Sequence, residues 1–511
     1  MRKFSIILIA LAVSLVGKAE SFEQLRAKAA GKSIVLGNGC FLEGVVITDY
    51  KSRNVSENPQ LEWDKVDVRQ TYVTSYIQNE EGVLGFRLIF NDLYDNRLPA
   101  FTRVRIDLTG CELTGETSPE RYIIYGITPD KVQILGKADM SPRKLHIADL
   151  SDNDIYTYVS LQDVEFLSKE GSYTNVREYL VQPSYINSFP KPKGTDWIDE
   201  SGLHVKDNAG DAIFLPVNTT CAWRRRGERL PSGVGSINGV VVCETLRRCG
   251  NPGPYQIRIS GPEAVDIPMD GSSSYDTVAE WNWDRNYYYS LKCVSGEKLW
   301  LENMQIPYEG LLPDVGEGVL GMTVPGTMGP TGEFNTRCAQ DGLTMGEGNR
   351  ECAALMYETK AVDWLTPGAA LTIETSTKGF TGKGLTLDFT WVAGMQHNMD
   401  FSYGYPGKWK VAYSVDGRNF MPVDKIFLLR PIAWSKGGSV AYDAAAGYTE
   451  NTVLLPGFLL GKDKIWIRIY PASNLVTERH EDPAADIDTG RPDPEKVFKL
   501  RIGKVALKAL R

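Results

Sequence analysis

Short runs in which apolar and polar residues alternate, each ending near glycine, proline or asparagine, recur along almost the whole chain. This spacing of two is typical of β-strands, whose successive side chains point to opposite faces of a sheet. A helical pattern occurs near the N-terminus, where Phe22, Leu25 and Ala29 share one face and Gly31 follows as a stop signal. The sequence therefore predicts an all-β fold with a short leading helix over residues 21–31.

A repeat is visible within the first half of the chain. Each copy contains a strand, a hairpin with a glycine, a Leu-Pro dipeptide, another strand and a closing strand. These lie at residues 41–49, 76–88, 98–99, 103–110 and 122–125, and again at residues 158–166, 203–215, 230–231, 235–242 and 255–259. The repeat predicts two tandem OB-like Greek-key barrels. They span residues 20–138, including the helix, and residues 139–265, with an insertion over residues 167–200.

The second half has the pattern of a different β fold. Residues 409–420 alternate, turn at Asp416-Gly417 and return, which predicts a β-hairpin. Residues 464–470 and 498–507 have the pattern of late strands. We expect a C-terminal jelly-roll β-sandwich over residues 281–511. A stretch rich in glycine and serine, residues 266–280, is predicted to be a linker.

Several motifs carry a resemblance to known families. They are the leading helix, GVVITD at residues 44–49, IQNEEGV at residues 77–83 and SLQDVEF at residues 160–166. Through them residues 21–268 resemble a family of exported Bacteroidetes proteins known as a domain of unknown function, although Asn79 replaces the usual acid. That resemblance implies fold and export but no chemistry. WKVAYSVDGRNF at residues 409–420 resembles the hairpin of discoidin-like, galactose-binding-like domains, which implies a fold rather than a ligand.

The first residues predict export. Arg2 and Lys3 precede an apolar run over residues 4–16, which is short for a membrane span, and small residues end at Ala19. We predict a signal peptide over residues 1–19, cleaved after Ala19. No cysteine follows the run, so the lipoprotein pattern is not met. The predicted location is the periplasm, the cell surface or the extracellular space, with no transmembrane segment in the mature chain.

Charge and cysteine content argue against several classes of protein. The net charge is −8, and removal of residues 1–19 takes away three basic residues, leaving 53 basic against 64 acidic residues, a net charge of −11. This balance opposes general nucleic-acid binding. The eight cysteines form no CxxC pair and the four histidines are far apart, so no metal site is predicted. Cys243 and Cys249 flank a predicted turn and are expected to lie within disulfide reach.

Catalytic motifs are missing from the sequence, and no catalytic residue or cofactor is predicted. HExxH, GxSxG and P-loop patterns do not occur. Residues 316–321 spell GxGxxG, but without the preceding strand and following helix that a dinucleotide site needs. Acidic pairs such as Asp152 with Asp154 are typical of solvated loops. They also occur in calcium sites and glycosidases, so a hydrolase remains an alternative.

One candidate ligand site lies in the second predicted barrel, at Trp223, Arg224, Arg225 and Arg226. Arginine forks bind phosphate, sulfate or carboxylate, and an exposed tryptophan ring can stack on a ligand. The alternative is a turn whose arginines pair with acids such as Glu228 and whose tryptophan lies in the core.

A second candidate site is the loop over residues 394–407, with His397, Tyr403 and Tyr405. Aromatic rings beside hydrogen-bonding groups are what a sugar site needs. The alternative is a long loop packed by its own aromatic residues.

Together these features predict a non-catalytic binding or structural protein of the bacterial periplasm or cell surface. Its expected partner is a glycan or another component of the cell envelope. The alternative is an accessory module for extracellular nucleic-acid binding or processing, which the arginine cluster favours and the net charge opposes.

Overall fold

The computed structural model describes residues 19–56, 60–62, 65–66, 69–167, 173, 200–218, 221, 223, 229–244, 253–281, 312–323, 336–340, 353–360, 367–395, 406–429, 449–472, 476–479, 486–489 and 497–511. Contacts divide the chain into two units. The described residues of unit 1 lie within residues 19–48, 73–140 and 152–157, and those of unit 2 within residues 49–72, 141–151 and 158–511. The residues of the predicted signal peptide before Ala19 lie outside the described ones.

Unit 1 begins with helix α1 (Phe22–Ala29), as the sequence predicts. The Ser21 hydroxyl accepts the Gln24 N–H (3.2 Å) and the Gln24 side chain accepts the Ser21 N–H (2.9 Å), so the first turn of the helix is capped. Phe22, Leu25 and Ala29 are buried in the core of the unit. The apolar face of the helix that the sequence predicts is therefore the one that packs against the core of unit 1.

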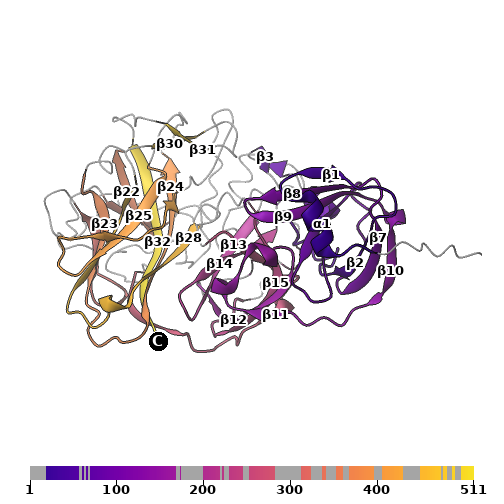
Figure 1. Cartoon of the computed structure of the whole chain (residues 1–511). Coiled ribbons are helices and arrows are strands. Elements are labelled where there is room, and N and C mark those ends of the chain that lie inside the picture. The colour runs from indigo at the N-terminus through magenta and orange to yellow at the C-terminus, as the bar shows by residue number, and fades with distance from the viewer. Residues whose placement is uncertain are drawn as a thin grey trace, which may run out of the picture. The chain divides into compact units, whose positions relative to one another are not determined.

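An eight-stranded sheet forms the body of unit 1, in the order β1-β8-β9-β6-β5-β2-β7-β10 (Figure 1). Its strands are β1 (Ser33–Val35), β2 (Phe41–Val46), β5 (Thr74–Gln78), β6 (Gly85–Phe90), β7 (Thr102–Asp107), β8 (Glu112–Thr117), β9 (Glu120–Ile127) and β10 (Val132–Lys137). Short helices of unit 1 are η1 (Pro129–Lys131) and η3 (Asp152–Asp154). Helix α2 (Arg69–Val73) precedes β5, and its first four residues belong to unit 2. β6 and β9 are parallel, and the other neighbours in the sheet are antiparallel.

The first sheet of unit 2 closes into a small barrel. Its strands are β11 (Arg143–Leu145), β12 (Tyr158–Phe166), β13 (Glu200–Asp207), β14 (Ala212–Asn218), β15 (Gly235–Val242), β16 (Gln256–Arg258) and β17 (Val265–Asp266). β12 pairs with both β13 and β15, so the order β12-β13-β14-β16-β15 returns to its start. The sheet is therefore closed, while the tandem OB-like Greek-key arrangement that the repeat suggests remains a prediction. Unit 2 also contains η2 (Ile147–Asp149), η6 (Pro262–Ala264) and the small pair β3 (Gln60–Glu62) and β4 (Lys65–Val66).

Two further sheets of unit 2 form a sandwich. The first contains β18 (Tyr275–Trp281), β19 (Val315–Gly316), β21 (Thr336–Gln340), β22 (Ala353–Lys360), β24 (Gly384–Met395), β28 (Thr449–Pro456) and β32 (Val497–Leu510). The second contains β20 (Val319–Thr323), β23 (Ala370–Thr375), β25 (Lys408–Ser414), β26 (Met421–Pro422), β27 (Phe427–Leu428) and β29 (Ile465–Pro471). A helix η8 (Gly457–Leu459) and the pair β30 (Val476–Arg479) and β31 (Asp486–Thr489) complete the described elements.

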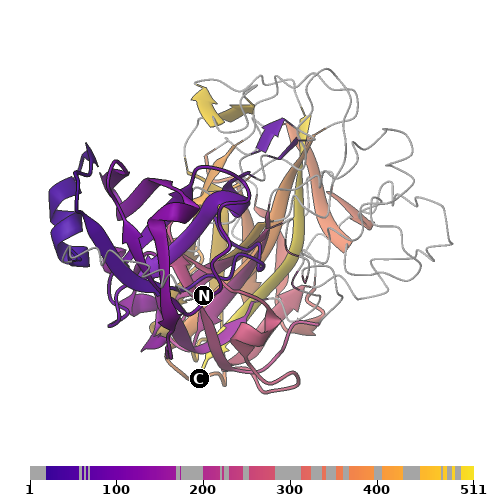
Figure 2. The ribbon, with the colours of Figure 1, turned by 90° about the vertical axis from the view of Figure 1, so that its right-hand side faces the viewer.

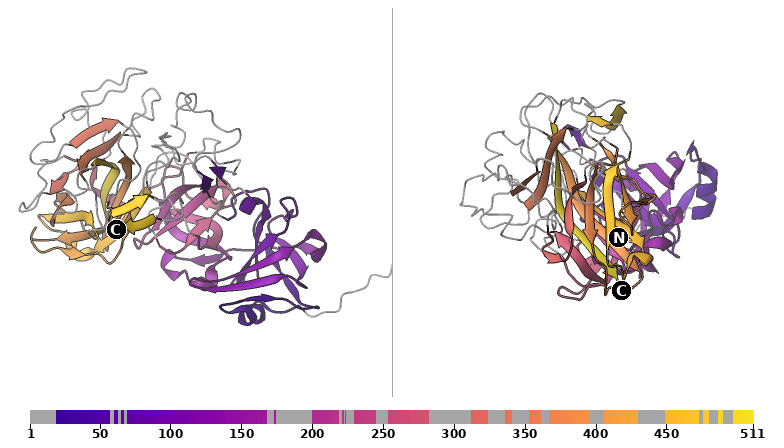
Figure 3. Two further views of the ribbon diagram at one scale, coloured as in Figure 1. Left: turned by 90° about the horizontal axis from the view of Figure 1, so that it is seen from above. Right: turned by 90° about the vertical axis from the view of Figure 1, so that its left-hand side faces the viewer.

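Both sheets of the sandwich contribute to one apolar core, in which the rings of Trp391 and Trp409 lie 5.4 Å apart. The long C-terminal strand β32 runs through the sandwich and is visible in yellow from two further directions (Figure 2, Figure 3). The prediction of an all-β chain is confirmed by these sheets. No helix in the described ranges has the length and apolar character needed to cross a membrane.

The segment expected to be a linker, residues 266–280, contains structure at both ends. β17 ends at Asp266, and β18 begins at Tyr275 and pairs with β32. Tyr275, Val278 and Trp281 are buried and are the apolar residues of this strand. The run of glycine and serine just before them led to the prediction of a linker. The division of the chain at residues 138, 265 and 280 remains a prediction.

Candidate functional site

The candidate residue Trp223 is buried in the core of the second barrel, with 6% of its surface exposed. Its ring meets the Tyr173 ring edge-on at 5.9 Å. The expectation of an exposed stacking ring at Trp223 is therefore wrong, because the indole packs inside the barrel core. Arg224, Arg225, Arg226, His397, Tyr403 and Tyr405 lie outside the described residues, as does Cys249, and their roles remain predictions.

The outer face of the second barrel is covered along β13. Leu203 and Val205 point into the barrel core, so the alternating residues His204 and Lys206 point outward, yet each is only 1% exposed. The Lys206 ammonium donates to Asp388 of β24 (2.9 Å) and lies 3.6 Å from the centre of the Tyr275 ring. In the OB-like barrel that the sequence predicts, this face would receive ligands. In the structure the sandwich occupies it, through the contact of Lys206 with Asp388.

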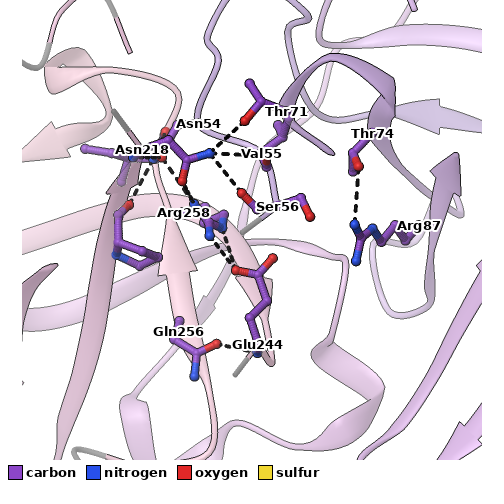
Figure 4. Close-up of polar contacts among 12 residues, drawn as sticks. Asn54, Val55, Ser56, Thr71, Thr74, Arg87, Asn218, Glu244, Gln256 and Arg258 are labelled. Carbon is purple, nitrogen blue, oxygen red and sulfur yellow. Dashed lines mark hydrogen bonds and ion pairs between the residues drawn. The ribbon is translucent and has the colours of Figure 1, made fainter. Parts of the chain in front are cut away.

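Other polar groups of the barrel are held by the segment that contains Asn54. The Asn54 side-chain amide donates to the carbonyls of Pro216 (3.1 Å) and Ile259 (3.0 Å). Arg258 donates to the Asn218 side chain (2.8 Å) and forms a buried ion pair with Glu244, and Figure 4 shows this chain of contacts. These groups satisfy one another, so we read this network as the means by which the segment is fastened to the barrel.

The second sandwich sheet presents a different surface on the side away from its core. Along β29, Ile465, Ile467 and Ile469 are buried in the core. The intervening residues Trp466, Arg468 and Tyr470 must then share the outer face. We call the surface formed by Glu374, Lys410, Phe420, Lys464, Trp466, Arg468 and Tyr470 the outer sheet face.

One end of the outer sheet face is internally paired. The Trp466 indole N–H donates to Glu374 Oε2 (2.8 Å), while Lys464 Nζ lies 2.5 Å from Glu374 Oε1. The hairpin turn at Gly417 also covers the Trp466 ring, because a Cβ placed on Gly417 would lie 3.0 Å from it. Both carboxylate oxygens of Glu374 are therefore engaged within the protein.

The other end of the outer sheet face carries unsatisfied donors. The Arg468 guanidinium lies 3.8 Å from the centre of the Phe420 ring, and its buried Nε has no hydrogen-bond partner among the described residues. Lys410 lies directly opposite Tyr470 in the pairing of β25 with β29. Burial lowers the pKa of Arg468 and raises the pKa of Tyr470. Arg468 and Tyr470 are both half-buried, so a ligand would meet them partly desolvated.

This end of the outer sheet face combines aromatic rings with cations. Within the described ranges no three histidine, cysteine, aspartate or glutamate side chains gather as a metal site would require. Two aromatic rings and two cations instead lie on one flat surface. The signal was present in the sequence, since Trp466, Arg468 and Tyr470 alternate within the strand predicted at residues 464–470. The sequence of the strand does not show which of its two faces remains exposed, because that depends on which other elements pack against it.

No protein-family model and no curated protein sequence matches the chain. The likeness to solved structures is limited, as three of them illustrate. The K1 cleaved adhesin domain of Lys-gingipain from Porphyromonas gingivalis W83 is 11% identical over 38% of this chain and 93% of that one, with a TM-score of 0.21. The K2 adhesin domain of Lys-gingipain is 14% identical over 46% and 98%, with a TM-score of 0.21. The CBM22-1 xylan-binding domain of Paenibacillus barcinonensis Xyn10C is 6% identical over 37% and 86%, again with a TM-score of 0.21. Values this low define no family and assign no ligand.

Proposed function

We propose that this chain is an exported, non-catalytic binding protein of the bacterial envelope that holds a glycan on the outer sheet face. The observation that carries the proposal is the set of Phe420, Tyr470, Arg468 and Lys410 on one surface of the sandwich. Sugar rings present a flat apolar face and a rim of hydroxyls, so a site for them combines aromatic rings with hydrogen-bonding groups. This surface offers both.

The arrangement of acids supports binding without turnover. Glycoside hydrolysis uses two carboxyl groups on either side of the scissile bond. Among the described residues of the outer sheet face the single acid is Glu374, and Trp466 and Lys464 hold its two oxygens. The proposal therefore assigns the face no catalytic residue.

The burial of Trp223 and of the outer side of β13 weighs against the nucleic-acid alternative. An OB-type barrel binds single strands by stacking bases on exposed aromatic rings. Here Trp223 lies in the barrel core, and the outward residue Lys206 is engaged by Asp388. The glycan proposal needs neither of these groups.

The test is a glycan array with the secreted protein, followed by affinity electrophoresis of the wild type and Tyr470→Ala on the polysaccharides that bind. Loss of one stacking ring is expected to weaken binding by about tenfold or more. Phe458→Ala is the matched control, because Phe458 is 50% exposed but contacts Tyr413, whose side chain packs against the core. Equal affinity of wild type and Tyr470→Ala, or release of shortened glycan, would contradict the proposal.

A further inference from the structure

Several cations of the sandwich are paired with acids. Lys464 pairs with Glu374 (2.5 Å), Lys378 with Asp463 (2.9 Å) and Lys504 with Glu280 (3.0 Å). In a chain with more acids than bases such pairing is expected. A partly buried cation with no such pair among the described residues is different, because its charge is neither fully hydrated nor compensated.

Arg468 and Lys410 are two such cations, and they are neighbours. Within the described residues neither forms a hydrogen bond or an ion pair with a carboxylate. Arg468 is also half-buried, and a desolvated guanidinium without an acceptor is unfavourable unless something else supplies one. Among the described residues, this positive centre therefore has no counter-charge on the outer sheet face.

The geometry of the centre suits an anionic group. Tyr470 and Lys410 are directly opposite each other across two antiparallel strands, so their Cβ atoms lie about 5 Å apart. Arg468 is two residues along the same strand, which places it diagonally about 7–8 Å from Lys410. The Phe420 ring lies against the guanidinium, and stacking on its flat side leaves its N–H edge available to a planar acceptor. The hydroxyl of Tyr470 can supply a further donor.

We infer that the outer sheet face selects glycans that carry an acidic substituent, a carboxylate or a sulfate. Arg468 would bind the acidic group along its N–H edge, Lys410 would contribute the second positive charge, and Tyr470 would hold the adjoining sugar ring. The inference rests on the proposed function and specifies its substrate class. It also gives Arg468 and Lys410 a counter-charge, which a neutral glycan would not supply.

The experiment compares polymers that share a backbone and differ in charge. Affinity electrophoresis of the secreted protein is carried out with polygalacturonate against its methyl ester, and with dextran sulfate against dextran. At least one acidic polymer is expected to bind about tenfold more tightly than its neutral counterpart, and to lose affinity as salt is raised. The two pairs distinguish a carboxylate from a sulfate as the recognised group.

Three variants locate the effect. Lys410→Gln and Arg468→Gln are each expected to reduce binding of the acidic polymer by about tenfold, with little change for neutral polymers. Lys378→Gln removes the same charge from an exposed pair elsewhere on the sandwich and is expected to bind as wild type. Since Arg468 also packs on Phe420, thermal unfolding of each variant is measured, and Lys410→Gln carries the test if Arg468→Gln does not fold.

The failure of this inference is distinguishable from failure of the proposed function. If neutral and acidic polymers bind equally and Tyr470→Ala weakens both, the glycan site stands and the charge selection is wrong. If acidic polymers bind but Lys378→Gln weakens them as much as Lys410→Gln does, the attraction is general and the inference is also overturned. If no polymer or arrayed glycan binds, both proposals fall.

Discussion

Asp388 lies at the centre of a buried charge cluster in unit 2. It lies 2.9 Å from Lys206 and 3.5 Å from Lys508 and accepts the Thr452 hydroxyl at 2.6 Å. Burial opposes ionisation of Asp388, but the two ammonium groups and the hydroxyl outweigh it and lower the pKa of the carboxyl. Burial lowers the pKa of Lys206 to about 8, so at pH 7 the pair is still charged.

Asp388→Asn should therefore destabilise the protein strongly, because two lysines would be left buried without a counter-charge. The expected loss is about 3–5 kcal/mol in the free energy of unfolding at pH 7, measured by urea denaturation. Asp463→Asn, which breaks the exposed pair with Lys378, should shift the urea midpoint far less. Similar losses in both variants would show that the buried cluster contributes no more than a surface pair.

His204 gives unit 2 a sensitivity to acid. Its two ring nitrogens are buried and have no hydrogen-bond partner among the described residues. Burial, reinforced by the nearby positive charge of Lys425, lowers the pKa of the imidazole to about 3 from its ordinary 6.5. Between those values the unfolded chain binds a proton that the folded chain does not. Stability therefore falls as the pH drops below about 6.5.

The prediction is that His204→Leu removes this sensitivity. For the wild type, His204 should contribute a loss of about 2 kcal/mol in the free energy of unfolding between pH 7 and pH 5, and the variant should lack that loss. His146→Leu is the control, since the His146 side chain is 49% exposed. Urea denaturation at both pH values measures the difference. An unchanged pH dependence in His204→Leu would show that the imidazole is not buried in its neutral form.

At the scale of elements, the hairpin between β25 and β26 illustrates how local sequence specifies local structure. Asp416 accepts the N–H groups of Arg418 and Asn419, each at 2.8 Å, and these hydrogen bonds lower the pKa of its carboxyl. Gly417 follows with φ +69°, a conformation that side chains disfavour. Asp-Gly between alternating runs therefore predicts both the turn and its position.

Gly417 and Gly461 form a matched pair for testing the packing of this turn. Both have nearly the same positive φ, but a Cβ on Gly417 would lie 3.0 Å from the Trp466 ring, whereas a Cβ on Gly461 would meet nothing within 4 Å. Gly461→Ala should lower the free energy of unfolding by about 1 kcal/mol through backbone strain. Gly417→Ala should lower it by about 1–3 kcal/mol more, through overpacking against the ring. Urea denaturation of both variants gives the difference, and equal losses would mean that the turn does not press on Trp466.

Strands were predictable where alternation is local and complete. The strands predicted at residues 158–166 and 235–242 have the bounds of β12 and β15, and the one at residues 464–470 is β29 shifted by a residue. β18 was not predicted, since its apolar residues follow a run of glycine and serine. The buried polar residues Lys206 and Asp388 follow the same alternation as exposed ones. Their burial results from another element packing on the outward face, which no single strand encodes.

The candidate site was predictable to a similar extent. Trp466, Arg468 and Tyr470 alternate visibly in the sequence. The run of one tryptophan and three arginines at residues 223–226 nevertheless gave the stronger signal for a ligand site. Composition cannot distinguish an exposed ring from one that fills a core. Glu374 lies 92 positions before Trp466 in the sequence, and Lys464 is close to Trp466. Only the folded sheet brings Glu374 into contact with these two residues.

At the scale of the whole molecule, the second barrel and the sandwich of unit 2 are joined by more than a covalent connection. Glu165 of β12 is 1% exposed and accepts the Ser273 hydroxyl (2.6 Å) and the Ser274 N–H (3.0 Å). The Tyr275 hydroxyl donates to the Asp207 carbonyl (2.5 Å) of β13. These contacts hold the glycine- and serine-rich segment against the barrel just before it enters β18.

Limited proteolysis should therefore spare residues 273–281 in the wild type, although their composition alone predicts an early cut there. Proteases need an unfolded stretch of backbone, and this one is fixed by buried hydrogen bonds. Glu165→Ala removes both acceptors and should raise the rate of cleavage between Pro268 and Tyr275 by about tenfold or more, since it removes at least about 1.4 kcal/mol of local stability. Asp163→Ala, on the same strand but with a side chain that is 53% exposed, should leave the rate unchanged. Mass spectrometry of the fragments identifies the cut. Rapid cleavage of the wild type at this point would mean that the segment is a free linker and that the barrel and the sandwich are held together by the Lys206–Asp388 cluster without it.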